Sequence, residues 1–220
     1  MTGMKLYYSP GACSLAAHVV LEEIGHPHEL VRVHTGYEEH LAPAYLAINP
    51  VGLVPTLEID GQRLTETTAI LRYLARTAPN AALEPSEPLP AARVDEVLSR
   101  LASLAHPAYR MVIRPDRVAK ETGVSQEGLQ AIGRRDFAAT LDHIEVSLPD
   151  EGFVAGAFSI ADPYLFVFWS WARYARFDTD RWPRITRIAR TVASRDATRR
   201  ALVAEALVDA EGRPTPPERV

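Results

Sequence analysis

A proline-rich segment near one third of the chain divides it into two parts with different patterns. Four prolines stand within twelve residues: Pro79, Pro85, Pro88 and Pro90. Proline fixes φ and has no backbone N–H, so this density argues against a central strand or a helix interior. We therefore expect a first domain at residues 1–78, a linker at 79–90 and a second domain at 91–220.

The part before the linker alternates short β-rich and helical patterns. Residues 5–8 predict a strand, apolar residues from Leu15 to Ile24 recur at helical spacing, and Gly25 suits the helix C-terminus. Residues 29–33 predict a second strand, and a β-α-β unit favours a parallel pair. A hairpin of strands 56–59 and 62–64 follows, turning at Asp60-Gly61, and then a helix that begins at Thr65 or Glu66.

The part after the linker shows only helical periodicity. Helices are predicted over residues 94–108, 129–148, 161–174, 185–192 and 202–207, and a frayed tail over 211–220. Residues 161–174 are apolar nearly all round, which indicates a buried central helix. Ser159 can cap that helix, and Asp162 can reach back to the Ser159 backbone N–H.

Composition excludes several classes of function. A net charge of -4 argues against general nucleic-acid binding. The absence of a long apolar run or of a signal peptide argues against a membrane protein and favours the cytoplasm. Cys13 is the single cysteine, and the seven histidines form no convincing ligand-spaced cluster, so we expect no metal site. His26, His28, His34 and His40 lie around a strand and a loop.

The first of three local signals is Cys13-Ser14, which follows a strand and opens a helix. Free backbone N–H groups and the positive end of the dipole favour a thiolate or an anion there. An inert Cys13 and a merely capping Ser14 explain the same residues.

The second and third signals stand at Val54-Pro55, before a strand, and at Glu66-Thr67, at a helix start. If the Val54–Pro55 peptide is cis, the Val54 backbone can pair with a peptide-like ligand; a trans turn proline is the alternative. Glu66 and Thr67 can bind an α-amino-carboxylate group, or they can simply open the helix.

The order of these three signals resembles the glutathione transferase superfamily, most closely its bacterial beta class. The resemblance rests on residues 4–15, Leu46–Pro50, Val54-Pro55, residues 64–74 and Ser159–Asp162 with residues 164–166, and runs over roughly residues 4 to 208. It implies an α/β thioredoxin-like N-terminal domain that binds glutathione, and an all-α C-terminal helical domain with an acceptor pocket near residues 104–114.

The resemblance also implies an activity and roles for particular residues. The enzyme would be a cytoplasmic, homodimeric glutathione transferase of detoxification type, joining the thiolate of its co-substrate glutathione to small hydrophobic electrophiles. Cys13 and Ser14 would lie beside the glutathione sulfur, with His106 facing the site and Tyr8 where other classes keep a catalytic tyrosine. Val54 and Pro55 would hold the cysteinyl backbone, and Glu66 and Thr67 the γ-glutamyl end.

Some positions depart from the class. Val51 and Pro107 stand where lysine is frequent, and Pro107 predicts a kink at His106; a helix-edge histidine without a ligand is the alternative for His106.

Two other functions stay open: a glutathione-dependent thiol-disulfide reductase or peroxidase that uses Cys13, and a non-catalytic binding or regulatory protein on the same fold. The acceptor substrate is not indicated by the sequence.

Overall fold

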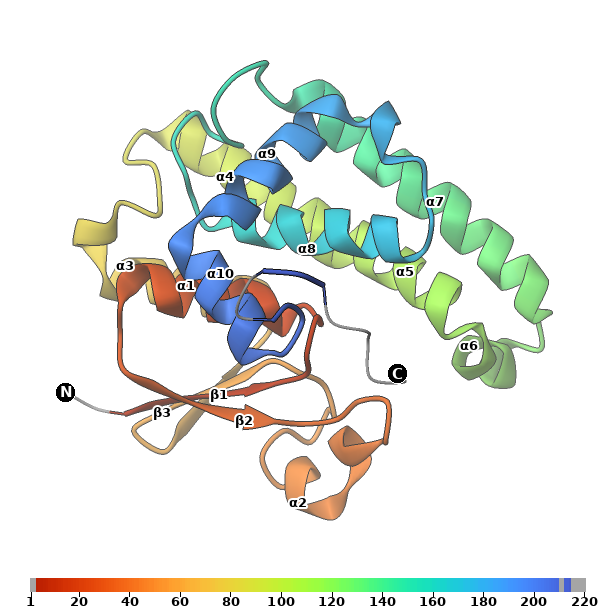
Figure 1. Ribbon diagram of the computed structural model, residues 1–220. Coiled ribbons are helices and arrows are strands. Elements are labelled where there is room, and N and C mark those ends of the chain that lie inside the picture. Colours follow the sequence, from red (N-terminus) through yellow and green to blue (C-terminus); the bar gives the residue numbers. More distant parts are fainter. Residues whose placement is uncertain (1–2, 210–211, 215–220) are drawn as a thin grey trace. The chain divides into compact units, whose positions relative to one another are not determined.

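The computed structural model describes residues 3–209 and 212–214, and Figure 1 shows its ribbon. The chain forms two compact units, residues 1–83 with 191–220 and residues 84–190. None of the helices in the described part of the chain is long and apolar enough to cross a membrane. The predicted frayed tail falls mainly on residues outside the described ones.

The first unit is built on a four-stranded mixed sheet. Its strands are β1 (Met4–Tyr8), β2 (His28–Arg32), β3 (Thr56–Ile59) and β4 (Gln62–Thr65), in the order β2-β1-β3-β4. β1 runs parallel to β2, while β3 is antiparallel to both β1 and β4. The β-α-β opening and the hairpin predicted from the sequence are confirmed.

Helices cover both faces of this sheet. α1 (Ser14–Ile24) and α3 (Thr67–Thr77) lie on one face and the short α2 (Pro43–Leu46) lies on the other. Gly25 ends α1 in the left-handed conformation, with φ 63°, as its position predicts. Short 3-10 turns stand at Glu39–Leu41 and Pro79–Ala81.

The predicted linker is partly helical, which corrects one boundary. α4 (Pro88–Arg100) begins with two of the linker prolines, and the division between the units falls at Leu83 and Glu84. A proline in the first turn of a helix sacrifices no intrahelical bond, because the first N–H groups have no partner there. Proline density therefore marks a helix start here as well as a linker.

The C-terminal helix belongs to the first unit, although the sequence places everything after residue 90 in one domain. α10 (Asp196–Ala204) starts earlier than the predicted 202–207 and packs beside α1 (Figure 1). Arg195 forms two bonds to the Glu23 carboxylate, and Arg200 bonds Glu22. These ion pairs join α10 to residues some 170 positions earlier in the chain. Hydrophobic periodicity reports only on neighbouring residues, so it does not predict such long-range pairs.

The second unit contains helices only, apart from isolated bridges, among its described residues. They are α4, α5 (His106–Ile113), α6 (Pro115–Thr122), α7 (Gln126–Ser147), α8 (Ala161–Tyr174) and the greater part of α9 (Pro183–Ser194), with a 3-10 turn at Thr179–Arg181. α6 has no counterpart among the predicted helices. Gly133 of α7 lets α5 approach closely, since a Cβ there would stand 2.6 Å from the Ala108 carbonyl oxygen.

The central helix α8 and its cap are as predicted. The Asp162 carboxylate accepts the Ser159 backbone N–H at 2.8 Å and its hydroxyl at 3.0 Å, and also the Val154 N–H at 2.9 Å. The Ser159 hydroxyl oxygen accepts the Ala161 N–H at 3.4 Å. Burial raises the pKa of Asp162 to about 6, while these hydrogen bonds act in the opposite direction.

Candidate functional site

Cys13 stands at the N-terminus of α1 with its side chain turned into the first unit. Its thiol donates to the Val54 carbonyl oxygen, with Sγ 3.4 Å from that oxygen. Only 5% of Cys13 is exposed. Burial raises the pKa of the thiol to about 11, although hydrogen bonds from Thr67 and from the backbone at the start of α1 lower it. At neutral pH the side chain is therefore a neutral thiol.

Val54 is positioned by the loop that leads into β3. The Val54–Pro55 peptide is cis, which settles the alternative left open by the sequence. The preceding carbonyl, of Leu53, accepts the Tyr45 hydroxyl and the Asn49 side-chain amide, both at 2.7 Å. Gly52 turns this loop with φ 66°, where a Cβ would lie 3.0 Å from the His40 carbonyl oxygen.

Glu66 and Thr67 open α3 beside the same thiol. Thr67 is buried and its side chain lowers the pKa of the Cys13 thiol, whereas Glu66 is exposed. The backbone of Glu66 has φ 71° and ψ 118°, a conformation that costs a residue with a side chain about 1–3 kcal/mol. Such strain persists only where surrounding structure holds it. The three sequence signals thus meet around one sulfur atom.

The remaining predicted residues of the first unit have other contacts. The Ser14 hydroxyl is fully buried, donates to the Ser9 carbonyl at 3.2 Å and accepts the Ser9 N–H at 3.3 Å. Tyr8 is buried with its ring 6.1 Å from the His18 ring. These contacts hold the turn between β1 and α1 and the packing under it.

His106 belongs to the second unit and starts α5. Its ring lies edge-on to Trp171 at 5.0 Å and to Phe168 at 6.0 Å between centroids. Burial, with a smaller contribution from Arg110, lowers its pKa to about 4, so the ring is neutral near pH 7. At the place where Pro107 predicts a kink, the structure has a π-helical turn, Leu101–Ala105; a wider turn accommodates a ring that would clash with the preceding turn.

One group of residues was missed by the sequence reasoning on metals. Ligand atoms of His18, Glu22 and His28 lie within 4.8 Å of one another. The available signal was a histidine and a glutamate four positions apart, which face the same side of a helix. The third member comes from a neighbouring strand, and only the fold brings it close.

Comparisons with known proteins agree with this architecture. The family described as "Glutathione S-transferase, N-terminal domain" matches residues 2–76. The curated glutathione S-transferase GstA of Escherichia coli O157:H7 is 34% identical over 93% of this chain and all of its own. A Sulfitobacter glutathione transferase homologue, solved with bound glutathione, is 38% identical with a TM-score of 0.84, covering 90% of this chain and 96% of its own.

A second solved structure bears on the class. The bacterial beta class glutathione S-transferase of Sphingomonas chungbukensis is 33% identical, with a TM-score of 0.80 over 93% of this chain and all of its own. Identity at this level over nearly the whole chain, together with the shared fold, establishes the relationship. The chain belongs to the glutathione S-transferase family, and within it is most like the bacterial beta class.

Proposed function

We propose that this protein conjugates reduced glutathione to small hydrophobic electrophiles. The thiolate sulfur attacks an electrophilic carbon, a carbon–sulfur bond forms, and the leaving group departs with its electron pair. The work of the protein is to hold glutathione, raise its thiolate fraction and keep the acceptor close. Together with the family relationship, this is the reaction that the chemistry of the first unit supports best.

The observation that carries the proposal is the meeting of Cys13, Val54 and Thr67 at the N-termini of two helices. Each helix end offers backbone N–H groups and a positive partial charge, which favour anions. We assign the γ-glutamyl carboxylate to the start of α3 with Thr67, and its ammonium group to the exposed Glu66. The cysteinyl backbone would pair with Val54, which directs the sulfur toward the start of α1.

The contacts of Cys13 and Ser14 refine their proposed roles. A neutral Cys13 thiol can donate a weak hydrogen bond to the glutathione thiolate once a ligand replaces Val54 as its acceptor. The Ser14 hydroxyl would have to leave the Ser9 carbonyl to do the same, so we assign Ser14 chiefly to shaping the turn. Thiolate stabilisation then falls mainly to the N–H groups at the start of α1.

The thiol-disulfide reductase or peroxidase reading is less well supported. A redox cysteine needs a thiolate and access, whereas Cys13 is buried and its pKa lies at about 11. The roles of Tyr8 and His106 rest on the family resemblance alone. A homodimer and a cytoplasmic location complete the proposal by family analogy.

Calorimetric titration of reduced glutathione into the purified protein tests the site, followed by turnover of an activated aryl chloride. Thr67→Val should weaken glutathione binding about 5- to 13-fold, as expected for one lost hydrogen bond of about 1–1.5 kcal/mol. Glu66→Gln should weaken it further, because the ammonium group loses its charged partner.

The neighbouring Thr68→Val is the matched control, since it removes a hydroxyl from the same helix turn. Equal glutathione binding by the wild type, Thr67→Val and Glu66→Gln would contradict the assigned site. Undetectable binding by the wild type at several millimolar glutathione would contradict the transferase proposal and favour a non-catalytic role on this fold. Substituting Val51 with lysine would then ask whether the missing cation explains the loss.

A further inference from the structure

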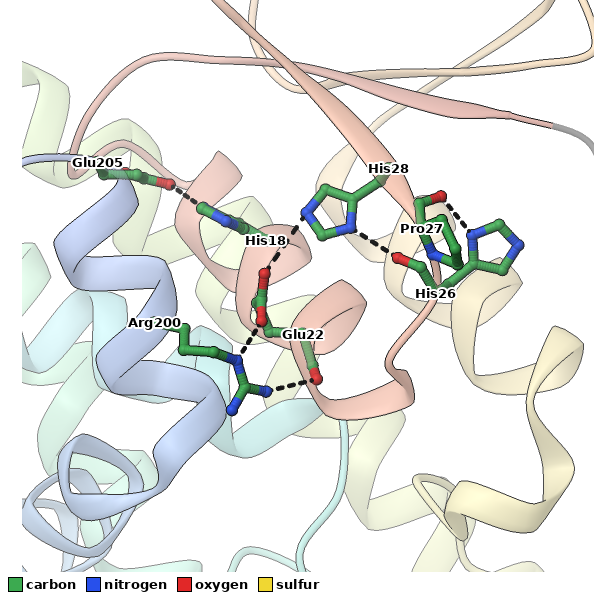
Figure 2. Close-up of polar contacts among 7 residues, drawn as sticks. All are labelled: His18, Glu22, His26, Pro27, His28, Arg200 and Glu205. Atoms are coloured by element: carbon green, nitrogen blue, oxygen red, sulfur yellow. Dashed lines mark hydrogen bonds and ion pairs between the residues drawn. The ribbon is translucent and has the colours of Figure 1, made fainter.

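A second cluster of polar side chains lies in the first unit, on the face where α1 meets β2 and α10. His18 and Glu22 come from α1 and His28 from the start of β2, and Figure 2 shows their side chains converging. The cluster shares none of its residues with the proposed glutathione site. Its chemistry follows from how each of the three side chains is held.

His18 presents an unpartnered nitrogen inside the protein. Its side chain is completely buried, and its Nδ1 lies 2.9 Å from the Glu205 carboxylate. When Glu205 is an ionised carboxylate it can only accept, so Nδ1 donates to it and Nε2 of the neutral ring carries a lone pair. Among the residues that the structure describes, that Nε2 atom has no hydrogen-bond partner. A buried polar atom of this kind costs about 1–3 kcal/mol unless something satisfies it.

His28 is oriented in the same way. Its Nδ1 donates to the His26 carbonyl oxygen at 2.8 Å, so the proton again sits on Nδ1. Its Nε2 faces Glu22 Oε1 at 3.8 Å. Two acceptor atoms that face each other need a donor or a cation between them, such as a water molecule, a proton or a metal ion.

Glu22 supplies the third ligand atom and is fixed from its other side. Arg200 of α10 donates from Nε to Glu22 Oε2 at 2.5 Å and from Nη2 to the Glu22 carbonyl oxygen at 3.0 Å (Figure 2). Oε1 is left directed at the histidines. Each ligand is thus oriented by an outer partner, as is usual around metal ions in proteins.

We propose that His18, Glu22 and His28 form a binding site for a divalent transition-metal ion such as Zn²⁺. Two imidazoles and one carboxylate suit zinc and its neighbours rather than calcium or magnesium, which prefer oxygen ligands. With bonds of about 2.0–2.1 Å and tetrahedral angles, zinc ligands stand about 3.3 Å apart. The ligand atoms, which lie within 4.8 Å of one another, would therefore have to draw together to about that spacing, and a fourth position remains for water or another ligand.

The site would tie three elements of the first unit together. α1 contributes two ligands and β2 the third, while α10 supplies the outer partner Arg200 and the residue that follows this helix supplies the other, Glu205. A metal ion that binds the folded chain and not the unfolded one raises the unfolding temperature in proportion to the logarithm of its concentration above Kd. Stabilisation by the ion is therefore a readout that does not depend on catalysis.

Titration of Zn²⁺ into the metal-free, tag-free full-length protein tests the proposal, by calorimetry and by thermal unfolding. We expect one ion per chain and a rise in Tm. Mutating a residue that only orients a metal ligand typically weakens metal binding about 10–100-fold. His28→Gln removes a ligand itself, so it should weaken Zn²⁺ binding by at least that factor. His26→Gln is the matched control, because it removes a half-buried histidine two residues away and leaves the three ligands in place.

Cobalt gives a second measurement that does not rest on the stability of a variant. Co²⁺ bound by the wild type should show visible absorption bands typical of low coordination number, which Zn²⁺ displaces and His28→Gln abolishes. Absence of binding by the wild type would overturn the proposal. Equal Zn²⁺ affinity of the wild type and His28→Gln would overturn it equally, since the ion would then sit on other surface groups.

Discussion

The reactivity of Cys13 gives the sharpest test of the proposed site. Burial raises the pKa of this thiol from 9.0 to about 11. At pH 7 the thiolate fraction is then about 1 in 10,000, against about 1 in 100 for a thiol with a pKa of 9.0. Alkylation requires the thiolate, so folding should slow it about 100-fold through ionisation alone, and further through the low exposure of the sulfur.

The assay is simple because Cys13 is the only cysteine. Mass spectrometry follows its alkylation by iodoacetamide between pH 7 and 10, in native protein and in protein unfolded by urea. The logarithm of the native rate should rise with unit slope through pH 10, whereas the rate of the unfolded chain should level off near pH 9. Thiolate is the reactive form, so raising the pH must accelerate both reactions until each thiol is ionised.

A native rate that levels off below pH 9 would refute the reasoning, provided that low urea leaves this rate unchanged. Acceleration by low urea would identify reaction through unfolded molecules instead. The result also bears on function. Slow alkylation of Cys13 in the native protein agrees with a conjugation activity that survives Cys13→Ala. Fast alkylation would favour the thiol-disulfide reductase.

Three further predictions concern the second unit. Asp162→Ala removes the acceptor of three buried donors and should lower the free energy of unfolding by about 3–5 kcal/mol in urea titration. Asp178→Ala, which removes only the exposed cap of a 3-10 turn, should lower it by about 1 kcal/mol or less. Gly133→Ala should lower Tm by an amount equivalent to about 1–3 kcal/mol, because its Cβ would meet the Ala108 carbonyl; an unchanged Tm would argue against the tight contact of α5 and α7. The His106 ring should titrate near pH 4 rather than 6.5 in NMR spectra, so its contribution to stability is complete above pH 6.5 and falls toward pH 4.

Elements with strong local signals were predictable from the sequence. α8 has the predicted bounds, Ala161–Tyr174, and its cap forms the predicted bonds between Ser159 and Asp162. Gly25 ends α1 where its freedom at positive φ is needed. These cases depend on residues within a few positions of each other, which is the range over which sequence patterns are informative.

Elements that depend on exceptions to a local rule were misjudged. Proline normally excludes a helix, yet the prolines at 88 and 90 occupy the first turn of α4, where the rule does not apply. The kink expected at Pro107 corresponds to a π-helical turn at Leu101–Ala105. In both places the helix adjusts its hydrogen bonding to the proline, so the residue type alone does not fix the outcome.

Contacts between distant parts of the chain explain what the sequence could not provide. Glu205 lies in no motif, yet its carboxylate accepts the Gly11 N–H at 2.9 Å and meets His18 at 2.9 Å, across 194 and 187 residues respectively. Gly11 lies in the turn that leads to Cys13, and His18 lies about one and a half helical turns after Cys13, on α1. A single buried carboxylate from the C-terminal segment therefore supports both the start of the proposed glutathione site and the histidine of the proposed metal site. The two sites share no ligand, but they share this support, because both are built on the same helix.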